Sequence, residues 1–319
     1  MTELKLIKDG VMVDISNISG NITLSNSIDS LGSSLNFDMA RNYRNLDYSV
    51  TEIIQVGDIV KLINNFQEVF IGVIVEVDTS KFKKSIKCLD FYFYLNKNRI
   101  IKQFNELNAS TAIQQLLVEL GIEIGVFENI PTSITKIYKK NTAAEIINDI
   151  LDRVNNERGE KYILELEGTK FNLIKHKKIE AKLQYNFVGD ITVNESMADM
   201  RNSIIVTSND QDSEEIIESA KDENNIKKYG LLQEVIEIDP DADDTAKVKN
   251  VAEKKLKELN KIFMKASVKV FGNNDLKAGR ILEVINDEYN LKGKYLIKSC
   301  THTYQREHLT DLELEVSDE

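Results

Sequence analysis

Residues 229–235 read YGLLQEV and open the stretch, ending at residue 316, that decides the fold of this chain. An Asp-rich turn follows them, and one long amphipathic segment follows the turn. Four strand-like runs then close the stretch: residues 266–270 (ASVKV), 279–284 (GRILEV), 293–303 (GKYLIKSCTHT) and 312–316 (LELEV). Short strands at this spacing, separated by turn residues, predict a small β-barrel that contains a helical insertion.

The amphipathic segment covers about residues 244–265, where apolar side chains recur at helical spacing. Residues 239–243 (DPDAD), just before it, have the acidic spacing of a calcium loop. However, Asp244 stands where that loop requires Gly, and Asn250 stands where it requires Glu. The acidic residues are better explained as the start of a helix, because the helix dipole favours negative charge there.

Residues 1–98 are predicted to form an N-terminal β-barrel. Apolar residues recur at every second position in residues 35–39 and 69–77, and this period places each set on one face of a strand. Turn residues separate the runs, as expected for short strands in a barrel or a sandwich. The aromatic run of residues 91–95 (FYFYL) ends the segment and is expected to offer the next domain a surface for packing.

Residues 99–185 are predicted to form a small central α+β domain. The spacing of apolar residues predicts a helix near residues 113–120. A second helix is expected to start at Thr142, because Glu145 three residues later completes a capping box. Two strand-like runs then flank residues 167–169 (EGT), which is typical of a hairpin.

Residues 186–319 are predicted to form the second β-barrel, with the helix of about residues 244–265 inserted in it. Strands are expected at residues 191–193 and 203–207. Residues 208–225 are polar and mostly acidic, so we expect an exposed, mobile loop there. The predicted fold class is therefore α+β and mainly β, with two tube-like barrels around a small central domain.

The bulk composition is that of a soluble globular protein. The chain has 319 residues, 42% of them hydrophobic and 29% charged, which favours two or three domains. A net charge of −11 argues against binding of the phosphate backbone of nucleic acids. The sequence shows no apolar run long enough for a membrane span and no signal peptide. We therefore expect the chain to be made and to mature in a cytosol.

Candidate chemical sites are weak. Cys88 and Cys300 lie in strand-like runs and are interpreted as reduced, buried thiols. His302, Glu307 and His308 could form a metal cluster or an acid–base group, but the last two are interpreted as part of a solvated turn. No nucleophile elbow, Cys–His signature or glycine-rich phosphate loop is present, whereas a pair of catalytic carboxylates stays possible in so acidic a chain. We expect no catalytic residues, no cofactor and no metal.

The first and last thirds of the chain share a plan of a turn glycine, an alternating strand, a hairpin and a returning strand. Residues 57–62 (GDIVKL) begin one copy and residues 279–284 begin the other. This internal similarity predicts two related barrels. We interpret four glycines as turn residues that fix strand register in the two copies: Gly57, Gly72, Gly279 and Gly293.

Several weak motifs follow one another along nearly the whole chain in a specific order. They include residues 56–58 (VGD), 89–90 (LD), 94–98 (YLNKN), 199–202 (DMRN), 229–233 (YGLLQ), 272–279 (GNNDLKAG) and 293–303. Together they resemble contractile-tail hub proteins of the phage late-control protein D group, specifically the XkdQ/YqbQ type of prophages and phage-tail-like bacteriocins. The resemblance rests in part on these single residues: Asp58, Asp90, Arg201, Asn202, Tyr229, Gly230 and His302.

The resemblance implies a non-enzymatic hub that is a trimer at the base of a contractile tail, similar to the central hub of T-even phages and the N-terminal part of VgrG spikes. Three subunits with two barrels each would join a six-fold tail tube to a three-fold spike. The implied partners are the tail tube or a tube-initiator protein, the central spike, a LysM-type tail protein and baseplate wedge proteins. Such a protein assembles in the bacterial cytoplasm and becomes part of a phage or bacteriocin particle. The helix of residues 244–265 is then expected to pack across the trimer interface.

Two other interpretations stay open. A VgrG-like secretion spike shares the hub architecture, but it would continue into an OB-fold and a β-helix needle after residue 319. A cell-wall hydrolase carried in a tail is the enzymatic alternative. The sequence does not distinguish a phage from a bacteriocin, and it does not identify the target bacterium.

Overall fold

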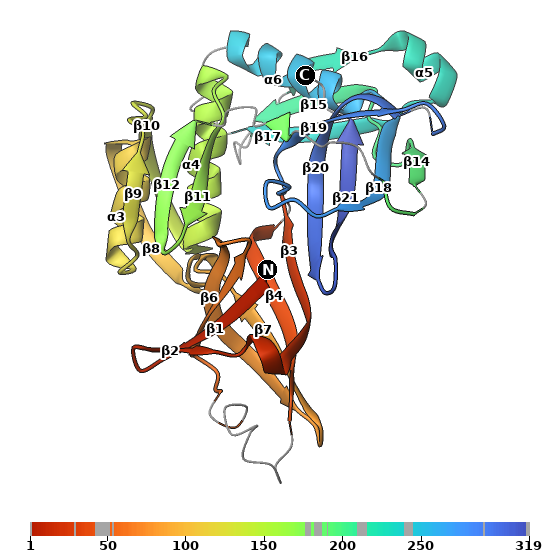
Figure 1. Ribbon diagram of the computed structural model, residues 1–319. Helices are drawn as coiled ribbons and strands as arrows, with labels where there is room; N and C mark the ends of the chain where they lie inside the picture. The colour runs from red at the N-terminus through yellow and green to blue at the C-terminus, as the bar shows by residue number, and fades with distance from the viewer. Residues whose placement is uncertain are drawn as a thin grey trace. The chain divides into compact units, whose positions relative to one another are not determined.

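The computed structural model describes residues 2–28, 30–41, 52, 54–175, 180–181, 187–189, 191–208, 216–238, 245–289 and 291–316. The chain divides into two compact units (Figure 1). The first unit comprises Met1–Ile191 and Ser267–Glu319, and the second comprises Thr192–Ala266. Strands dominate the secondary structure, so the predicted class, α+β and mainly β, is confirmed. The predicted boundaries near residues 98 and 185, and the closure of each strand set into a barrel, stay predictions.

One large sheet runs through the first unit. From β18 onward its strands, in spatial order, are β18 (Phe263–Phe271), β21 (His308–Val316), β20 (Leu291–Tyr304), β3 (Ser19–Ser27), β4 (Ser30–Ala40), β7 (Lys83–Leu89), β6 (Gln67–Thr79), β5 (Ile59–Asn64), β1 (Thr2–Lys8) and β2 (Val11–Asp14). β19 (Ile281–Asn286) pairs with β20 and with the short β13 (Glu180–Ala181). We call β1–β7 the first strand group and β18–β21 the second strand group.

The first strand group buries the alternating residues that the sequence pattern indicates. Leu35, Phe37 and Met39 of β4 are at most 1% exposed and lie in one core cluster. In β6 a bulge interrupts the alternation at Val75. Both faces of β6 are buried just before the bulge, and Ile74 is completely buried in the core. The period-two pattern is therefore a good guide to the core in β4, whereas in β6 it fails before the bulge, because both faces of the strand are buried there.

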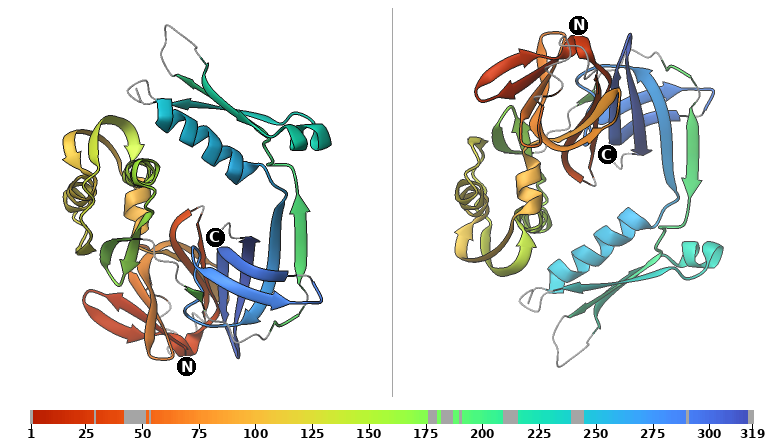
Figure 2. Two further views of the ribbon diagram at one scale, coloured as in Figure 1. Left: turned by 90° about the horizontal axis from the view of Figure 1, so that it is seen from above. Right: turned by 90° about the horizontal axis from the view of Figure 1, so that it is seen from below.

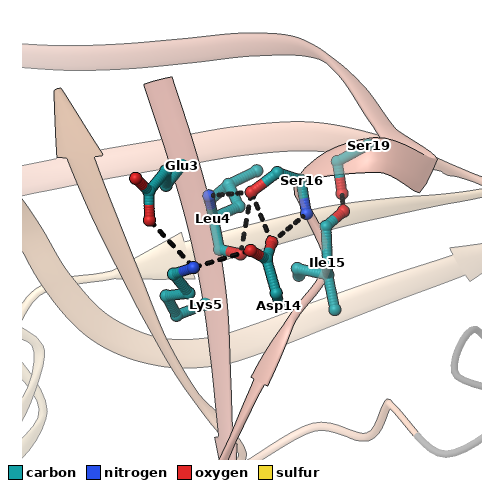
Figure 3. A network of polar contacts seen from close by, with 7 residues as sticks. All are labelled: Glu3, Leu4, Lys5, Asp14, Ile15, Ser16 and Ser19. Carbon is teal, nitrogen blue, oxygen red and sulfur yellow. Dashed lines mark hydrogen bonds and ion pairs between the residues drawn. The ribbon is translucent and has the colours of Figure 1, made fainter. Parts of the chain in front are cut away.

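A polar network fixes the first hairpin against the turn that follows it (Figure 3). Lys5 Nζ of β1 lies 2.6 Å from Asp14 Oδ2 of β2 and 2.8 Å from Glu3 Oε2. Asp14 also accepts hydrogen bonds from the backbone N and the hydroxyl of Ser16, at 2.9 and 2.6 Å. The Lys5 and Ser16 donors lower the pKa of Asp14 to about 2. Ser16 in turn accepts a bond from Leu4 N at 2.9 Å, so one side chain ties the turn η1 (Ser16–Ile18) to β1.

Between the two strand groups the chain forms a set of helices and small sheets around a separate core. Its elements are α2 (Tyr92–Lys97), β8 (Arg99–Asn108), α3 (Ala109–Glu119), β9 (Ile124–Phe127), β10 (Ser133–Thr142), α4 (Ala143–Arg158), β11 (Tyr162–Glu167) and β12 (Lys170–Lys175). Both predicted helices are present, and the predicted capping box begins α4. Thr142 Oγ1 accepts from Glu145 N at 3.1 Å, and the Glu145 carboxylate accepts from Thr142 N at 2.8 Å. The predicted hairpin joins β11 to β12, with Glu167 opposite Lys170.

The aromatic run of residues 91–95 is a short helix, so its prediction as the end of a β segment is wrong. The helix α2 begins at Tyr92, whose ring is 7% exposed and lies edge-on to Phe171, with ring centroids 4.8 Å apart. The Tyr92 hydroxyl donates to the backbone oxygen of Leu164. Consecutive aromatic residues carry no alternation that separates a strand from a buried helix, and helical turns place Tyr92 and Leu95 together in this core.

The second unit contains β14 (Thr192–Ser196), β15 (Ser203–Ser208), β16 (Ile216–Lys221), α5 (Glu223–Tyr229), β17 (Gln233–Ile238) and α6 (Thr245–Leu259). Three of its strands form a sheet in the order β16-β15-β17, in which β15 and β17 are parallel. Figure 2 shows α6 along this sheet. Val248 and Ala252 of α6 pack with Ile204 and Val206 of β15 in one buried cluster.

Two predictions for this region are wrong. The expected loop of residues 208–225 contains β16 and the start of α5 in its described part. The apolar stripe of α6 is covered by the sheet of its own unit, so it is not free to pack across a subunit interface. The calcium-loop residues 239–243 lie outside the described residues. Among the residues that the structure describes, no helix is long and apolar enough to span a membrane.

Candidate functional site

The two strand groups repeat one hydrogen-bonding pattern around two turn glycines. Gly57 has φ +96° and donates to Ile74 O at 2.8 Å, and Ile74 N donates to Asp58 O at 2.9 Å. Gly279 has φ +86°, and its backbone N donates to Ile297 O at 2.8 Å. Ile297 N in turn donates to Arg280 O at 2.9 Å. The positive φ favours glycine at both turns. Each glycine thus sets the start of the strand that follows.

The repeat extends along the strands. β6 has its bulge one residue after Ile74, and β20 has its bulge one residue after Ile297. The buried positions also correspond, because Val60 and Leu62 of β5 match Leu282 and Val284 of β19 in being at most 1% exposed. Two bulges in matching register strengthen the internal similarity seen in the sequence, since a bulge is a specific structural feature of a strand pair.

The other two glycines do not lie in turns, which corrects their interpretation as turn residues. Gly72 lies inside β6 opposite Val60, and Gly293 lies inside β20 opposite Val284. By the common register, Gly72 corresponds to Tyr295 and not to Gly293. A Cβ on Gly72 would lie 2.3 Å from Leu89 O, so glycine is needed there for close packing of backbones. Gly293 has φ +130°, and a Cβ there would meet open space.

A junction within the first unit joins the two strand groups through β3 and β20. The strands are antiparallel, with Ser25 opposite Thr301, and the hydroxyls of these two residues lie 3.0 Å apart. Ile28 N donates to Lys298 O at 2.9 Å, at the bulge of β20. We call β3, β20 and the flanking turns of residues 64–67 and 272–280 the seam.

Amide side chains connect the two turns of the seam. Asn64 Nδ2 donates to Asn274 Oδ1 at 2.8 Å, and Asn274 Nδ2 donates to Gln67 Oε1 at 3.1 Å. Asn64 is 3% exposed, so its amide group depends on these partners for its hydrogen bonds. Sequence reasoning did not predict this contact, because a single sequence does not show that two distant turns are neighbours.

A pair of histidines lies behind these amides. His302 Nε2 is 2.9 Å from Leu276 O and therefore carries the proton that it donates to this carbonyl. His302 Nδ1 is then an acceptor, and His308 Nε2 lies 2.9 Å from it. His308 Nδ1 in turn lies 3.3 Å from the Asn64 amide nitrogen. The bonds run from Asn64 through both rings to Leu276, and they require both imidazoles to be neutral.

The environment of the pair favours the neutral state. Burial lowers the pKa of His302, which is 2% exposed. Burial and the neighbouring His302 ring lower the pKa of His308 to about 4. Gly272 provides the space, because a Cβ on it would lie 2.2 Å from the His308 ring. The interpretation of His308 as part of a solvated turn is therefore wrong, since its ring packs on Tyr304 with centroids 4.4 Å apart.

The aspartates of the resemblance motifs stabilise turns. Asp58 accepts from Gln55 N at 2.8 Å and lies 3.2 Å from Lys8 Nζ. Asp90 is 6% exposed and accepts from Ser33 N at 2.5 Å and Tyr92 N at 3.1 Å. Burial raises the pKa of Asp90 to about 6, against the effect of these two donors.

The remaining motif residues lie in the second unit. Asn202 is fully buried; its Nδ2 donates to Gly230 O at 2.7 Å and its Oδ1 accepts from Leu232 N at 2.8 Å. Arg201 lies beside it and bonds Glu234 at 3.0 Å. Gly230 ends α5 directly after Tyr229. The structure thus brings Asn202 and Gly230 together, whereas the roles of all the motif residues in a tail stay predictions.

The described residues contain no group of three or more His, Cys, Asp or Glu side chains arranged to hold a metal ion. Cys88 and Cys300 are buried and unbridged, and burial raises the pKa of the Cys300 thiol to about 12. A cavity of about 740 Å³ opens beside the seam, and its lining includes Asp90, Asp152 and His302. Asp90 accepts hydrogen bonds from the backbone N of Ser33 and Tyr92, and His302 donates to the backbone oxygen of Leu276.

The sequence profile of the YQBQ-like family matches residues 22–315 of this chain. A comparison with curated proteins gives no match. Among solved structures, the 43 kDa tail protein of prophage MuSo2 from Shewanella oneidensis is similar, with a TM-score of 0.72 at 14% identity and 98% of each chain covered. The tail protein from Neisseria meningitidis MC58 has a TM-score of 0.71 at 13% identity, covering 99% of this chain and 97% of its own.

A third similar structure is the c3393 protein of E. coli, described as a component of the type VI secretion system with structural similarity to the T4 phage tail proteins gp27 and gp5. The TM-score is 0.52 at 10% identity, and the match covers 99% of this chain and 77% of that one. At such identities these likenesses show that the fold is shared.

Proposed function

The chain belongs to the YQBQ-like family, as its resemblance to XkdQ/YqbQ-type proteins predicts, and on that premise we propose that it is a structural hub of a contractile tail baseplate. In this proposal three copies form a ring, and each copy contributes two strand groups. The ring joins a six-fold tail tube to a three-fold spike.

The observation that carries the proposal is the repeated register of the two strand groups. A three-fold ring matches a six-fold partner only if each subunit presents two similar surfaces. The hairpins β5–β6 and β19–β20 supply such a pair, with matching turn glycines and matching bulges. Similarity to two tail proteins over nearly the whole chain supports the same role.

We propose that the protein acts through surfaces and not through catalysis. Its proposed partners are the tail tube or a tube-initiator protein, the central spike, a LysM-type tail protein and baseplate wedge proteins. Assembly takes place in the bacterial cytoplasm, and the product is the baseplate of a phage tail or tailocin. A zymogram on peptidoglycan tests the absence of hydrolase activity, and clearing by the purified chain would contradict it.

Size-exclusion chromatography with light scattering tests the trimer. We expect three chains of 36.4 kDa per particle, either for the protein alone or after addition of the spike protein. A stable dimer under both conditions would contradict the proposal.

A role in a type VI secretion spike is the second candidate. The similarity to c3393 favours it, as does a TM-score of 0.56 to a chain of the Francisella PdpA-VgrG complex, of which this chain covers 52%. The two candidates differ in their partners. Co-purification with a tail-tube protein from the same genome supports the phage-type hub, whereas co-purification with a secretion tube supports the second candidate.

A further inference from the structure

The loop between β5 and β6 holds a phenylalanine in a backbone conformation that favours glycine. Asn64 pairs with Gln67, so the loop consists of Asn65 and Phe66 alone. Both have positive φ, +50° for Asn65 and +64° for Phe66. A two-residue hairpin loop with this backbone favours Asn followed by Gly, because a bulky side chain at the second position is strained. Asn65 therefore suits the loop, and Phe66 does not.

The packing of the Phe66 ring does not offset this strain. The side chain is 91% exposed, the highest value among the large hydrophobic residues that the structure describes. Single exposed hydrophobic residues are common on protein surfaces, so exposure alone would not indicate a site. Strain at the same residue does indicate one, because strained residues concentrate where they make a functional contact. The contact that Phe66 lacks within its own chain is then one with a partner.

Hydrogen bonds fix the base of this loop. Asn64 is 3% exposed; its Oδ1 accepts from Thr2 Oγ1 at 3.1 Å, and its Nδ2 donates to Asn274 Oδ1 at 2.8 Å. On the other side of the loop, Gln67 Oε1 accepts from Asn274 Nδ2 at 3.1 Å. The Phe66 ring is therefore carried on an ordered support, which lowers the entropy that is lost when a partner binds it.

The second strand group carries an aromatic residue in the matching loop. By the common register Asn286 corresponds to Asn64, and Asn286 Oδ1 accepts from the backbone N of Tyr289 in the loop that follows, at 3.2 Å. β20 and β6 run in the same direction through the large sheet, because three strands separate them and all neighbouring pairs are antiparallel. The two aromatic loops precede these strands and therefore lie at the same end of the sheet.

We propose that Phe66 and Tyr289 anchor the hub to the tail tube, and that each ring inserts into an apolar pocket on one tube subunit. This inference rests on the hub function proposed above. Three copies present six aromatic loops at one end of the ring, which matches a six-fold tube and not a three-fold spike. Phe66 is the stronger anchor, because Tyr289 is already half-buried within its own chain. An aromatic ring that is buried at an interface often supplies a large share of the binding free energy.

The test measures binding of the assembled hub to rings of the tail-tube protein from the same genome, by biolayer interferometry. Spike protein is added if the hub needs it to form a trimer. The variant is Phe66→Gly, which removes the ring and gives the loop its favoured residue. We expect this variant to be more stable than wild type, so weaker binding by it cannot result from unfolding.

The matched control is Phe82→Ala. Phe82 is also an exposed aromatic residue, at 70%, and it lies in the turn between β6 and β7, at the opposite end of β6. Its φ is not positive, so it has no strain of the kind seen at Phe66.

We expect Phe66→Gly to raise the Kd for the tube about tenfold or more, and Phe82→Ala to leave it unchanged. Adding Tyr289→Ala to Phe66→Gly should raise the Kd further, and no further rise removes Tyr289 from the proposal. An unchanged Kd for Phe66→Gly, or an equal rise in the Phe82→Ala control, overturns the anchor and leaves the hub intact. Loss of spike binding in place of tube binding by Phe66→Gly overturns the assigned partner. If the wild-type hub binds no tube, the hub proposal itself fails, and this inference fails with it.

Discussion

The histidine pair at the seam predicts that stability falls as the pH falls. A folded-state pKa of about 4 for His308, against the usual 6.5, means that the unfolded chain binds a proton more readily than the folded chain. The contribution of the neutral His308 to the unfolding free energy is fully present above about pH 6.5 and is lost as the pH falls toward 4. The difference corresponds to about 3 kcal/mol. Because the His308 ring is only partly buried, we reduce this figure for solvent screening to about 1–2 kcal/mol.

The test compares wild type with His308→Gln, which keeps a polar side chain and removes the titrating ring. Urea denaturation at pH 7 and pH 4.5 gives the loss of unfolding free energy for each protein. We expect wild type to lose about 1 kcal/mol more than the variant over this interval. Carboxylates elsewhere titrate in both proteins, so only the difference between the two losses reports on His308. Equal losses would refute the neutral histidine pair.

Three further predictions concern single positions. Phe66 has φ +64° and is 91% exposed, so Phe66→Gly should raise the unfolding free energy by about 0.5–1 kcal/mol. Phe66→Ala keeps the strained backbone, and an equal rise of the unfolding free energy in both variants would contradict the role of the strain. Asn202→Leu leaves Gly230 O and Leu232 N without their partner and should lower the unfolding free energy, measured by urea denaturation, by about 2–4 kcal/mol. The same change at the exposed Asn224 should lower it by a few tenths of a kcal/mol, and similar losses at both positions would count against the buried bonds. Gly72→Ala should lower the midpoint of thermal unfolding markedly, because its Cβ would lie 2.3 Å from Leu89 O. The control is Gly20→Ala, whose Cβ meets no atom within 4 Å, and an unchanged midpoint for Gly72→Ala would show that the two backbones can separate.

Local patterns in the sequence were enough to predict the elements whose signals lie within a few residues. The capping box of Thr142 and Glu145 marks the start of α4, and the alternation from Leu35 to Met39 marks a buried face. Both signals reflect short-range geometry that one sequence contains in full.

Other features depend on contacts between distant residues and were missed. Ile216 lies in the polar, mostly acidic stretch that the sequence predicts to be a loop, because its strand is defined by pairing with β15. His308 looked solvated because the sequence does not show that Gly272 makes room for its ring.

The alignment of Gly72 with Gly293 failed for a different reason. The two hairpins share turn glycines at Gly57 and Gly279, so the strands of the repeat can be matched from their starts. Gly72 and Gly293 are simply the next glycines along each copy, and only the strand register shows that Gly72 matches Tyr295. Residue type alone therefore overestimated the agreement between the two copies, whereas backbone pairing shows where it holds.

Electron microscopy of this chain bound to the tail-tube protein and the spike protein of the same genome tests the central claim most directly. The hub proposal predicts three copies in one ring, with both strand groups of each copy beneath successive subunits of the six-fold tube. A ring of six copies, or a trimer that contacts the tube through only one strand group per copy, would contradict it.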